Sequence, residues 1–455
     1  MLNSSPPRFR VTSVELFERD VRLRMPFRFG VVTLSAAPQA FARARIRIEG
    51  GAAGGGQAVG AAAEMLLPKW FDKDPALTNE DNIGQLRGSL RSAREAYLAH
   101  EPRSAWAHSS PGRGLVENFG PALLDRALLD ALCRARGVSF QDAVRSNLIG
   151  AGEFEGMDLP GFFSGLSQGR AIAARHTVGL LDPITAADLE QRAGDGLPET
   201  LEEVVARYGQ RWFKLKVGGN LKADLERLAA IASVLDRIAE PYRASLDGNE
   251  QYEEMGAVAE LWSAMSAAMC ADIRLRRLVD SIAYIEQPVK RDKALQTRVS
   301  GVGKPVIIDE SDDALDAFPR AKAMGYRGVS SKSCKGLYKS LVNAARCKAW
   351  GGEYFITGED LTIQPGLALQ QDLALVSLLG LAHAERNGHH YVNGMAELPE
   401  SEQAAFLAAH PDLYERSQGA VRPRIAGGEL EIGSLDCVGF ASAAMPDWRS
   451  MRILQ

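Results

Sequence analysis

The sequence contains little cysteine, and none of it is paired. Five cysteines are scattered over 455 residues, and no two stand in a Cys-x-x-Cys arrangement. An odd number of unpaired cysteines gives no disulfide framework and fits a reducing compartment.

The chain also lacks strong charge of either sign and any long apolar run. Its formal net charge is −4 and its pI is near 6.1, so there is no basic footprint for nucleic acid or an anionic membrane. The most apolar stretch, 373–382, is too short to span a bilayer, and the N-terminus has no apolar core followed by a cleavage site. We therefore expect a cytoplasmic protein without nucleic-acid or membrane partners.

A glycine cluster at 50–56 lacks the residues of a phosphate loop. No Gly-Lys-Ser/Thr follows it, and its spacing does not give G-x-G-x-x-G. Residues 41–48 before it alternate apolar and basic side chains, and 58–62 after it form a second strand-like run. The pattern predicts a β-hairpin in an antiparallel sheet.

Acidic residues follow apolar strand-like runs at three places in the second half of the chain. Asp247, Glu286 and Asp309 are separated by 39 and 23 residues, and each interval suits one strand plus one helix of a βα repeat. We expect the three carboxylates to converge. Oxygen ligands without a His or Cys partner favour Mg²⁺, or Mn²⁺, over zinc.

Lysines flank these acids. Lys214 and Lys216 lie two positions apart in a strand-like run, so they share one face, which points inward in a barrel. Lys332 follows Asp309 by 23 residues and falls one repeat later. Two close ammonium groups disfavour each other's protonation and burial adds to this, so we expect one lysine to act as a base near neutral pH.

The ordered set of motifs resembles the enolase superfamily, and more closely its muconate-lactonizing-enzyme-like branch within the mandelate racemase/muconate lactonizing enzyme family. The motifs are Lys-x-Lys, Asp-x-Asn, Glu-Gln-Pro, Asp-Glu-Ser and Lys-x-x-Lys, in that order over residues 214–335. The mandelate-racemase branch would have a histidine late in the barrel, and the run 355–360 contains none. That departure favours lysine–lysine chemistry.

The resemblance implies a role for each matching residue. Asp247, Glu286 and Asp309 would bind the metal, Lys216 and Lys332 would form the acid/base pair, and Lys214 would support them. Asn249 would be a further supporting group, and Glu310 and Lys335 match the motifs at a greater distance from the metal. Glu359 would either line the site or cap the next helix.

The predicted fold class is α/β, a modified TIM barrel of (β/α)7β type with an α+β N-terminal capping domain. We expect the cap at 1–160, the barrel at 161–395, and a segment 396–455 that returns to the cap, as in the resembled family. Residues 79–136 are mostly helical in pattern, with Asn79 or Asp81 as N-cap. Barrel strands are predicted near 177–180 and at 212–217, 243–247, 282–286, 305–309, 327–331 and 353–357, and the eighth near 379–383 or at 391–392.

Two cap segments are candidates for contacting the substrate. Residues 24–30, with Arg28 and Phe29, stand where the resembled family has its mobile specificity loop, and 69–71 would form a second wall. Packing between the domains is the alternative interpretation for both.

The residues predict removal of a proton α to a carboxylate, with a metal neutralising the charge that develops. The expected substrate is a small carboxylate, and the outcome is racemisation or epimerisation, cycloisomerisation, or β-elimination as in an acid-sugar or other hydroxy-acid dehydratase. Rival hypotheses are a Schiff-base lyase on the same barrel and a catalytically silent binding protein. The resemblance alone implies a homo-oligomer.

Overall fold

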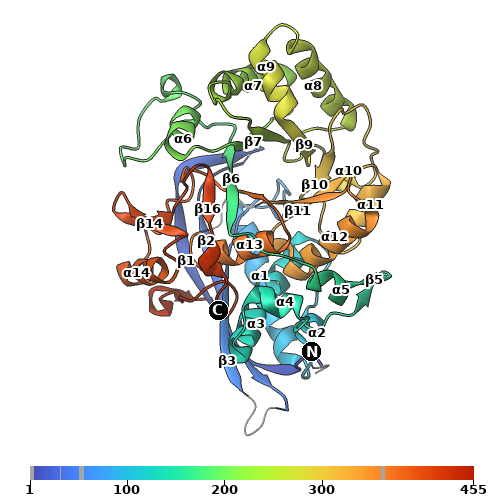
Figure 1. Cartoon of the computed structure of the whole chain (residues 1–455), viewed down its shortest axis with the longest axis vertical. Coiled ribbons are helices and arrows are strands. Elements are labelled where there is room, and N and C mark those ends of the chain that lie inside the picture. Colours follow the sequence, from blue (N-terminus) through green and yellow to red (C-terminus); the bar gives the residue numbers. More distant parts are fainter. Residues whose placement is uncertain (1–4, 31, 51–55, 360–363, 455) are drawn as a thin grey trace.

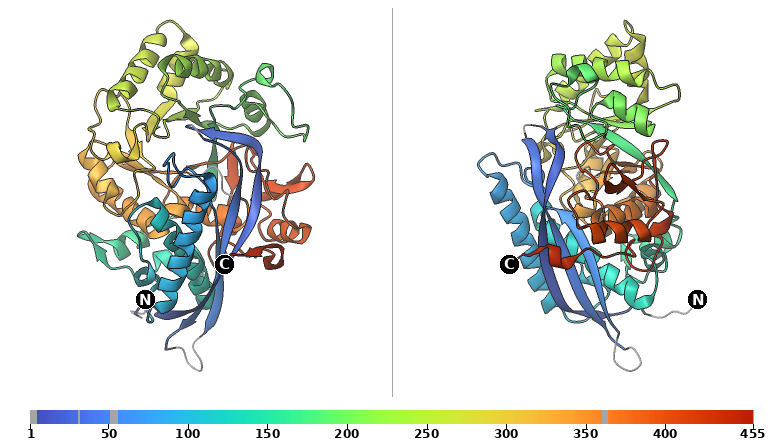
Figure 2. Two further views of the ribbon diagram at one scale, coloured as in Figure 1. Left: turned by 180° about the vertical axis from the view of Figure 1, so that it is seen from behind. Right: turned by 90° about the vertical axis from the view of Figure 1, so that its left-hand side faces the viewer.

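The computed structural model describes residues 5–30, 32–50, 56–359 and 364–454. A four-stranded antiparallel sheet stands beside a closed barrel of eight parallel strands, and a ninth strand is added to the barrel sheet in antiparallel orientation. The antiparallel strands run alongside the barrel in Figure 1, and both views of Figure 2 agree. The expected fold class, a capped TIM-type barrel, is confirmed.

The antiparallel sheet contains the predicted hairpin. Strand β1 (Phe9–Phe29) pairs with β2 (Val32–Ile48), and β2 pairs with β3 (Gln57–Met65). Of the glycine-rich turn, residues 51–55 lie outside the described residues. The short strand β17 (Arg452–Ile453) pairs with β1, so the last described part of the chain joins this sheet.

The predicted helical region after β3 contains α1 (Asn79–Ala99), α2 (Ala105–His108) and α3 (Leu115–Arg136), and α4 (Phe140–Arg145) follows. The N-cap of α1 is Thr78, and neither Asn79 nor Asp81 has that place. The Thr78 hydroxyl accepts from the Asp81 amide, and the Asp81 carboxylate accepts from the Thr78 amide, a capping box that an Asp can complete as Glu does. Helix α3 is buried on nearly all sides because it packs against both β3 and the barrel.

Close packing of β3 on α3 depends on Gly60. A Cβ at Gly60 would lie 2.2 Å from the amide nitrogen of Ala131 and 2.3 Å from the carbonyl oxygen of Ala127, both rigid backbone atoms. We expect Gly60→Ala to lower the free energy of unfolding by at least about 1–3 kcal/mol through overpacking. In the control Gly84→Ala, in α1, a Cβ meets nothing within 4 Å, so this variant should gain about 0.5–1 kcal/mol. Denaturant titration measures both, and equal effects would contradict this prediction.

Strands β7, β8 and β9 lie where the sequence predicts them, and the next three agree within two residues. The first strand begins earlier than expected, at Ala171. The eighth spans 383–385, so neither predicted window is right; with only three residues, two of them polar, it carries no readable alternation. The barrel strands are β6 (Ala171–Val178), β7 (Trp212–Lys216), β8 (Arg243–Asp247), β9 (Ile282–Glu286), β10 (Val306–Ile308), β11 (Gly328–Ser331), β12 (Phe355–Gly358) and β13 (His383–Glu385).

Helices lie between successive barrel strands, and β13 pairs with β6 to close the barrel. They are α6 (Leu201–Tyr208), α7 (Leu221–Leu235), α8 (Met255–Ala268), α9 (Ile273–Ser281), α10 (Arg291–Ala294), α11 (Ala317–Ala323), α12 (Leu337–Trp350) and α13 (Leu367–Leu378), with the 3₁₀ turns η1 (Ala186–Asp188) and η2 (Ser333–Lys335). The remaining elements are β4 (Glu153–Phe154), β5 (Met157–Asp158), α5 (Leu159–Ser164), α14 (Glu400–Ala409), β14 (Tyr414–Ser417), β15 (Ala420–Pro423), β16 (Glu429–Glu431), η3 (Gly433–Leu435) and η4 (Trp448–Ser450). None of the helices described is long and apolar enough to cross a membrane.

Candidate active site

The two lysines of β7 both lie inside the barrel. The alternate residues Phe213 and Leu215 are fully buried on the opposite face of the strand, where they belong to the same hydrophobic cluster as side chains of the barrel helices. Period-two alternation therefore places Lys214 and Lys216 on the inner face, where both are buried and both contact carboxylates from other strands.

Lys214 stands among four buried carboxylates. Its Nζ lies 2.9 Å from an oxygen of each of Asp247, Glu286 and Glu359, and 3.4 Å from Glu385. Burial acts to lower the pKa of Lys214, but these carboxylates raise it well above its usual value. This direction agrees with a supporting role for Lys214, because the carboxylates outweigh both burial and the neighbouring ammonium group.

The three acids proposed as metal ligands sit at neighbouring strand ends. Asp247 and Glu286 are paired in register across β8 and β9, and Asp309 follows β10 directly. All three side chains are at most 1 % exposed. Neither carboxylate oxygen of Glu286 accepts a hydrogen bond from the described residues. Burial and the carboxylates of Glu359, Asp247 and Asp309 together raise the pKa of Glu286 well above its usual range, although Lys214 opposes them.

These acids fit a hard divalent cation by their chemistry. The described residues contain no three His, Cys, Asp or Glu side chains already spaced as metal ligands, and the Lys214 ammonium contacts both Asp247 and Glu286. The donor set is nevertheless all oxygen, fully buried, and includes a glutamate whose oxygens lack hydrogen-bond donors. Mg²⁺ and Mn²⁺ prefer such ligands.

Lys216 and Lys332 each pair with a different one of these acids. The Nζ of Lys216 lies 2.5 Å from Asp247 and donates to the amide oxygen of Asn249 at 2.6 Å. Lys332 lies one residue past β11, where its Nζ lies 2.7 Å from Asp309. In the order of the barrel strands, β8 to β10, which lead to the three acids, lie between β7, which carries Lys216, and β11, which precedes Lys332.

The remaining motif residues lie behind these groups. Lys335 contacts Asp309 at 3.3 Å and Asp312 at 3.1 Å. Glu310 is fully buried and accepts from the amide of Asn249 at 3.2 Å. Burial acts to raise the pKa of Asp309, but Lys332 and Lys335 hold it well below its usual range.

The last two barrel strands add two glutamates. Glu359, whose role the sequence left open, points into the barrel: it contacts Lys214 and pairs with Arg175 of β6. Glu385 of β13 was not predicted. It accepts from Thr177 at 2.6 Å and lines the cavity described next. Its only sequence signal is an acid ending a short strand, which is too weak to single out.

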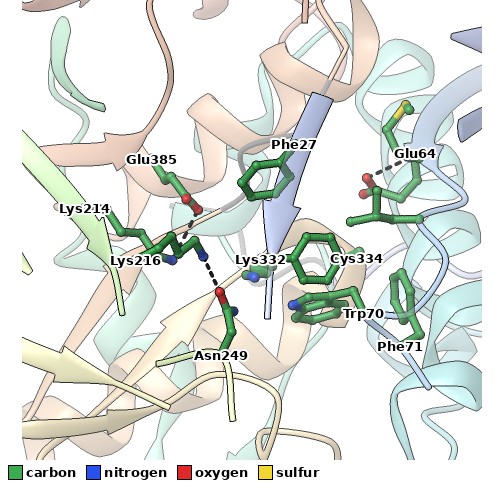
Figure 3. Close-up of a pocket in the computed structure, with 13 residues that line it drawn as sticks. Phe27, Glu64, Trp70, Phe71, Lys214, Lys216, Asn249, Lys332, Cys334 and Glu385 are labelled. Carbon is green, nitrogen blue, oxygen red and sulfur yellow. Dashed lines mark hydrogen bonds and ion pairs between the residues drawn. The ribbon is translucent and has the colours of Figure 1, made fainter. Parts of the chain in front are cut away.

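A cavity of about 50 Å³ lies over these groups. Lys214, Lys216, Asn249, Lys332 and Glu385 form its barrel side. The opposite side comes from the cap and is mostly apolar: Phe27, Phe29, Met65, Leu67, Trp70 and Phe71, with Glu64. Figure 3 shows Lys214 and Lys216 on one side and the rings of Trp70 and Phe71 on the other, with Lys332 beside the Trp70 ring. Asp247, Glu286 and Asp309 are not among the lining residues, but lysines that line the cavity contact all three.

The first cap segment is a strand and not the expected loop. Residues 24–29 complete β1, and Phe27 and Phe29 pair with Leu34 and Val32 of β2. Phe29 lines the cavity. The half-buried Arg28 does not; its Nε donates to the carbonyl of Gly30 at 3.4 Å. The second segment contributes Trp70, whose ring centroid lies 4.1 Å from the Lys332 Nζ.

Comparisons with known proteins agree with this architecture. Residues 196–408 match the family described as enolase C-terminal domain-like. A solved enolase-superfamily member from Roseovarius nubinhibens ISM is 17% identical, with a TM-score of 0.60 over 97% of each chain. Muconate lactonizing enzyme from Mycobacterium smegmatis, complexed with muconolactone, is 15% identical with a TM-score of 0.61 over 97% of this chain and 98% of that one. No curated protein matches the sequence.

A third similar structure is the L-Ala-D/L-Glu epimerase from Bacillus subtilis, 14% identical with a TM-score of 0.59 over 96% of this chain and all of that one. Identities this low establish the fold alone. The match of residues 196–408 to the enolase C-terminal domain-like family agrees with the enolase superfamily recognised from the motifs.

Proposed function

We propose that this enolase-type chain is an enzyme that removes a proton α to a carboxylate, with racemisation or epimerisation, or cycloisomerisation, as the outcome. The supporting observation is the placement of Lys216 and Lys332. Both line one small cavity, and each pairs with a different acid of the buried set.

Asp247, Glu286 and Asp309 would hold Mg²⁺, or Mn²⁺. When bound, the cation supplies positive charge that stabilises the negative charge developing on the substrate carboxylate. A solved relative from Roseovarius nubinhibens ISM is complexed with magnesium, which supports this choice of metal.

The lysines would move the proton. Lys216, oriented by Asn249, would take or return it on one face of the α-carbon, and Lys332 would do so on the other. Lys214, with its raised pKa, stays protonated and contributes fixed positive charge. Glu359, which follows β12, and Glu385 of β13 would hold Lys214 in place through their ion pairs with it.

The cap side of the cavity favours a substrate with an apolar substituent. Phe27, Phe29 and Trp70 offer rings at this wall, and the carboxylate of Glu64, its one polar side chain, is already paired with Arg126 at 2.8 Å. A polyhydroxylated acid would leave its hydroxyl groups without partners there, at a cost of about 1–3 kcal/mol for each one buried. This wall therefore supports an isomerase over an acid-sugar dehydratase.

Deuterium incorporation tests the proposal. The protein with Mg²⁺ in deuterated water, screened against carboxylic acids that carry an α-proton, should exchange that proton in at least one apolar acid, and a chelator should abolish the exchange. A Schiff-base lyase would instead form an adduct that borohydride traps and that a chelator does not prevent. Absence of exchange across the library would favour a silent binding protein.

A further inference from the structure

Glu250, the residue after Asn249, is an acid to which the proposed reaction gives no role. Glu250 is 5 % exposed and has a left-handed backbone with φ of 69°, and Asn249 before it has φ of 40°. Non-glycine residues persist in this region where surrounding contacts hold them, often at functional sites. The turn sends Asn249 toward Lys216 and Glu250 toward the cap.

Arg291 connects Glu250 to the cap. Its guanidinium binds both oxygens of the Glu250 carboxylate, at 2.9 and 2.8 Å, in a bidentate pair. The same guanidinium donates to the backbone carbonyls of Trp70 and Phe71, each at 2.9 Å. One arginine thus holds two of the cap residues whose rings line the cavity.

Lys73 makes a second connection. Its Nζ lies 2.5 Å from Glu250 and 3.1 Å from Glu310, and it donates to the carbonyl of Asn249 at 3.0 Å. Glu310 in turn accepts from the Asn249 side chain. Lys73, Glu250 and Arg291, here called the latch, therefore join cap residues 70–73 to the end of β8 in one network.

The latch contacts one neighbour of each proposed base. On the barrel side it borders Asn249, whose amide oxygen receives the Lys216 ammonium. On the cap side it fixes the backbone of Trp70, whose ring lies 4.1 Å from the Lys332 Nζ. A neighbouring acid, Glu253, forms ion pairs with Lys290 and Lys293 on the surface, and neither of these lysines belongs to the cap.

We propose that Glu250 and Arg291 are positioning residues: they hold cap residues 70–73 closed over the cavity and so fix Trp70 and Asn249 against the two lysines. Proton transfer depends steeply on such placement, since a shift of about 1 Å can cost about 100-fold in rate. The rate consequence rests on the proposed function. The proposal that the latch holds the cap does not rest on the proposed function.

Glu250→Gln and Arg291→Lys test the proposal, with Glu253→Gln as the matched control. Hydrogen exchange of a peptide covering 66–78, followed by mass spectrometry, reads cap closure without any substrate. Both latch variants should exchange about tenfold faster in this peptide, and the control should match the wild type. Calorimetry with Mg²⁺ alone should give affinities within about twofold of wild type, because the three acids are unchanged.

The kinetic readout uses the acid that exchanges fastest with the wild type. Its kcat for α-proton exchange should fall about 10–100-fold in each latch variant and stay unchanged in Glu253→Gln. Unaltered hydrogen exchange at 66–78 overturns the proposal. So does faster hydrogen exchange with an unaltered kcat. A wild type that exchanges no acid counts against the proposed function instead, and the hydrogen-exchange result still decides whether the latch holds the cap.

Discussion

Lys332→Ala should stop turnover in the direction that begins with proton removal by Lys332, while Lys216 still exchanges the proton on the other face. Lys216→Ala should show the mirror behaviour. The reason is that both lysines line the same cavity, that they come from strands on either side of those that lead to the acids, and that each pairs with a different acid. Loss of a general base costs about 10²–10⁴-fold in rate, which NMR in deuterated water resolves for each enantiomer.

A control separates this loss from a general effect of removing a lysine. Lys222 is 88% exposed at its side chain and pairs weakly with Glu226, so Lys222→Ala should leave the exchange rates unchanged. If either Lys216 or Lys332 proves dispensable for both exchange and turnover, the reaction uses one base. Racemase and epimerase chemistry would then give way to cycloisomerisation or elimination, with the other lysine as electrostatic support.

Glu286→Gln should remove Mg²⁺ binding and leave the fold intact. Glu286 is fully buried between Asp247 and Asp309, and neither of its oxygens accepts a hydrogen bond from the described residues, so the amide replaces no protein contact apart from the Lys214 ion pair. Loss of a residue that only hydrogen-bonds to a metal ligand lowers metal affinity by up to about 100-fold. Losing one of the three carboxylate ligands themselves should therefore weaken Mg²⁺ binding by at least that factor.

Calorimetry with Mg²⁺ and thermal unfolding measure the two halves of this prediction. Glu353→Gln is the matched control, because Glu353 is an exposed acid that pairs with Arg327 away from the cavity. It should bind Mg²⁺ as the wild type does. An unchanged Mg²⁺ affinity in Glu286→Gln would remove Glu286 from the ligand set, and with it the metal assignment made from the motifs.

The sequence alone determined the framework of the candidate site. Strands β7, β8 and β9 are long enough for apolar alternation to show, and each ends in a motif that is local in sequence. Side-chain period two then dictates that Lys214 and Lys216 share a face, whatever the rest of the chain does. The order and spacing of the acids followed from the length of a βα repeat.

Tertiary structure decided what depends on distant segments meeting. Glu385 stands on a strand of three residues, too short for a pattern, and reaches Lys214 only because β13 closes the barrel against β6. Of the four carboxylates that raise the pKa of Lys214, Asp247 and Glu286 follow from the motifs, whereas the approach of Glu359 and Glu385 depends on how the barrel closes.

The cap provides a second case. The resemblance implies a loop at residues 24–30, but pairing with β2 extends β1 through residue 29. The latch joins Lys73, Glu250 and Arg291, which are far apart along the chain. Backbone preferences act over a few residues and are readable from sequence, whereas contacts between the cap and the barrel are set by the packing of whole domains. The sequence therefore determined the acids and lysines, and only the folded chain determined what encloses them.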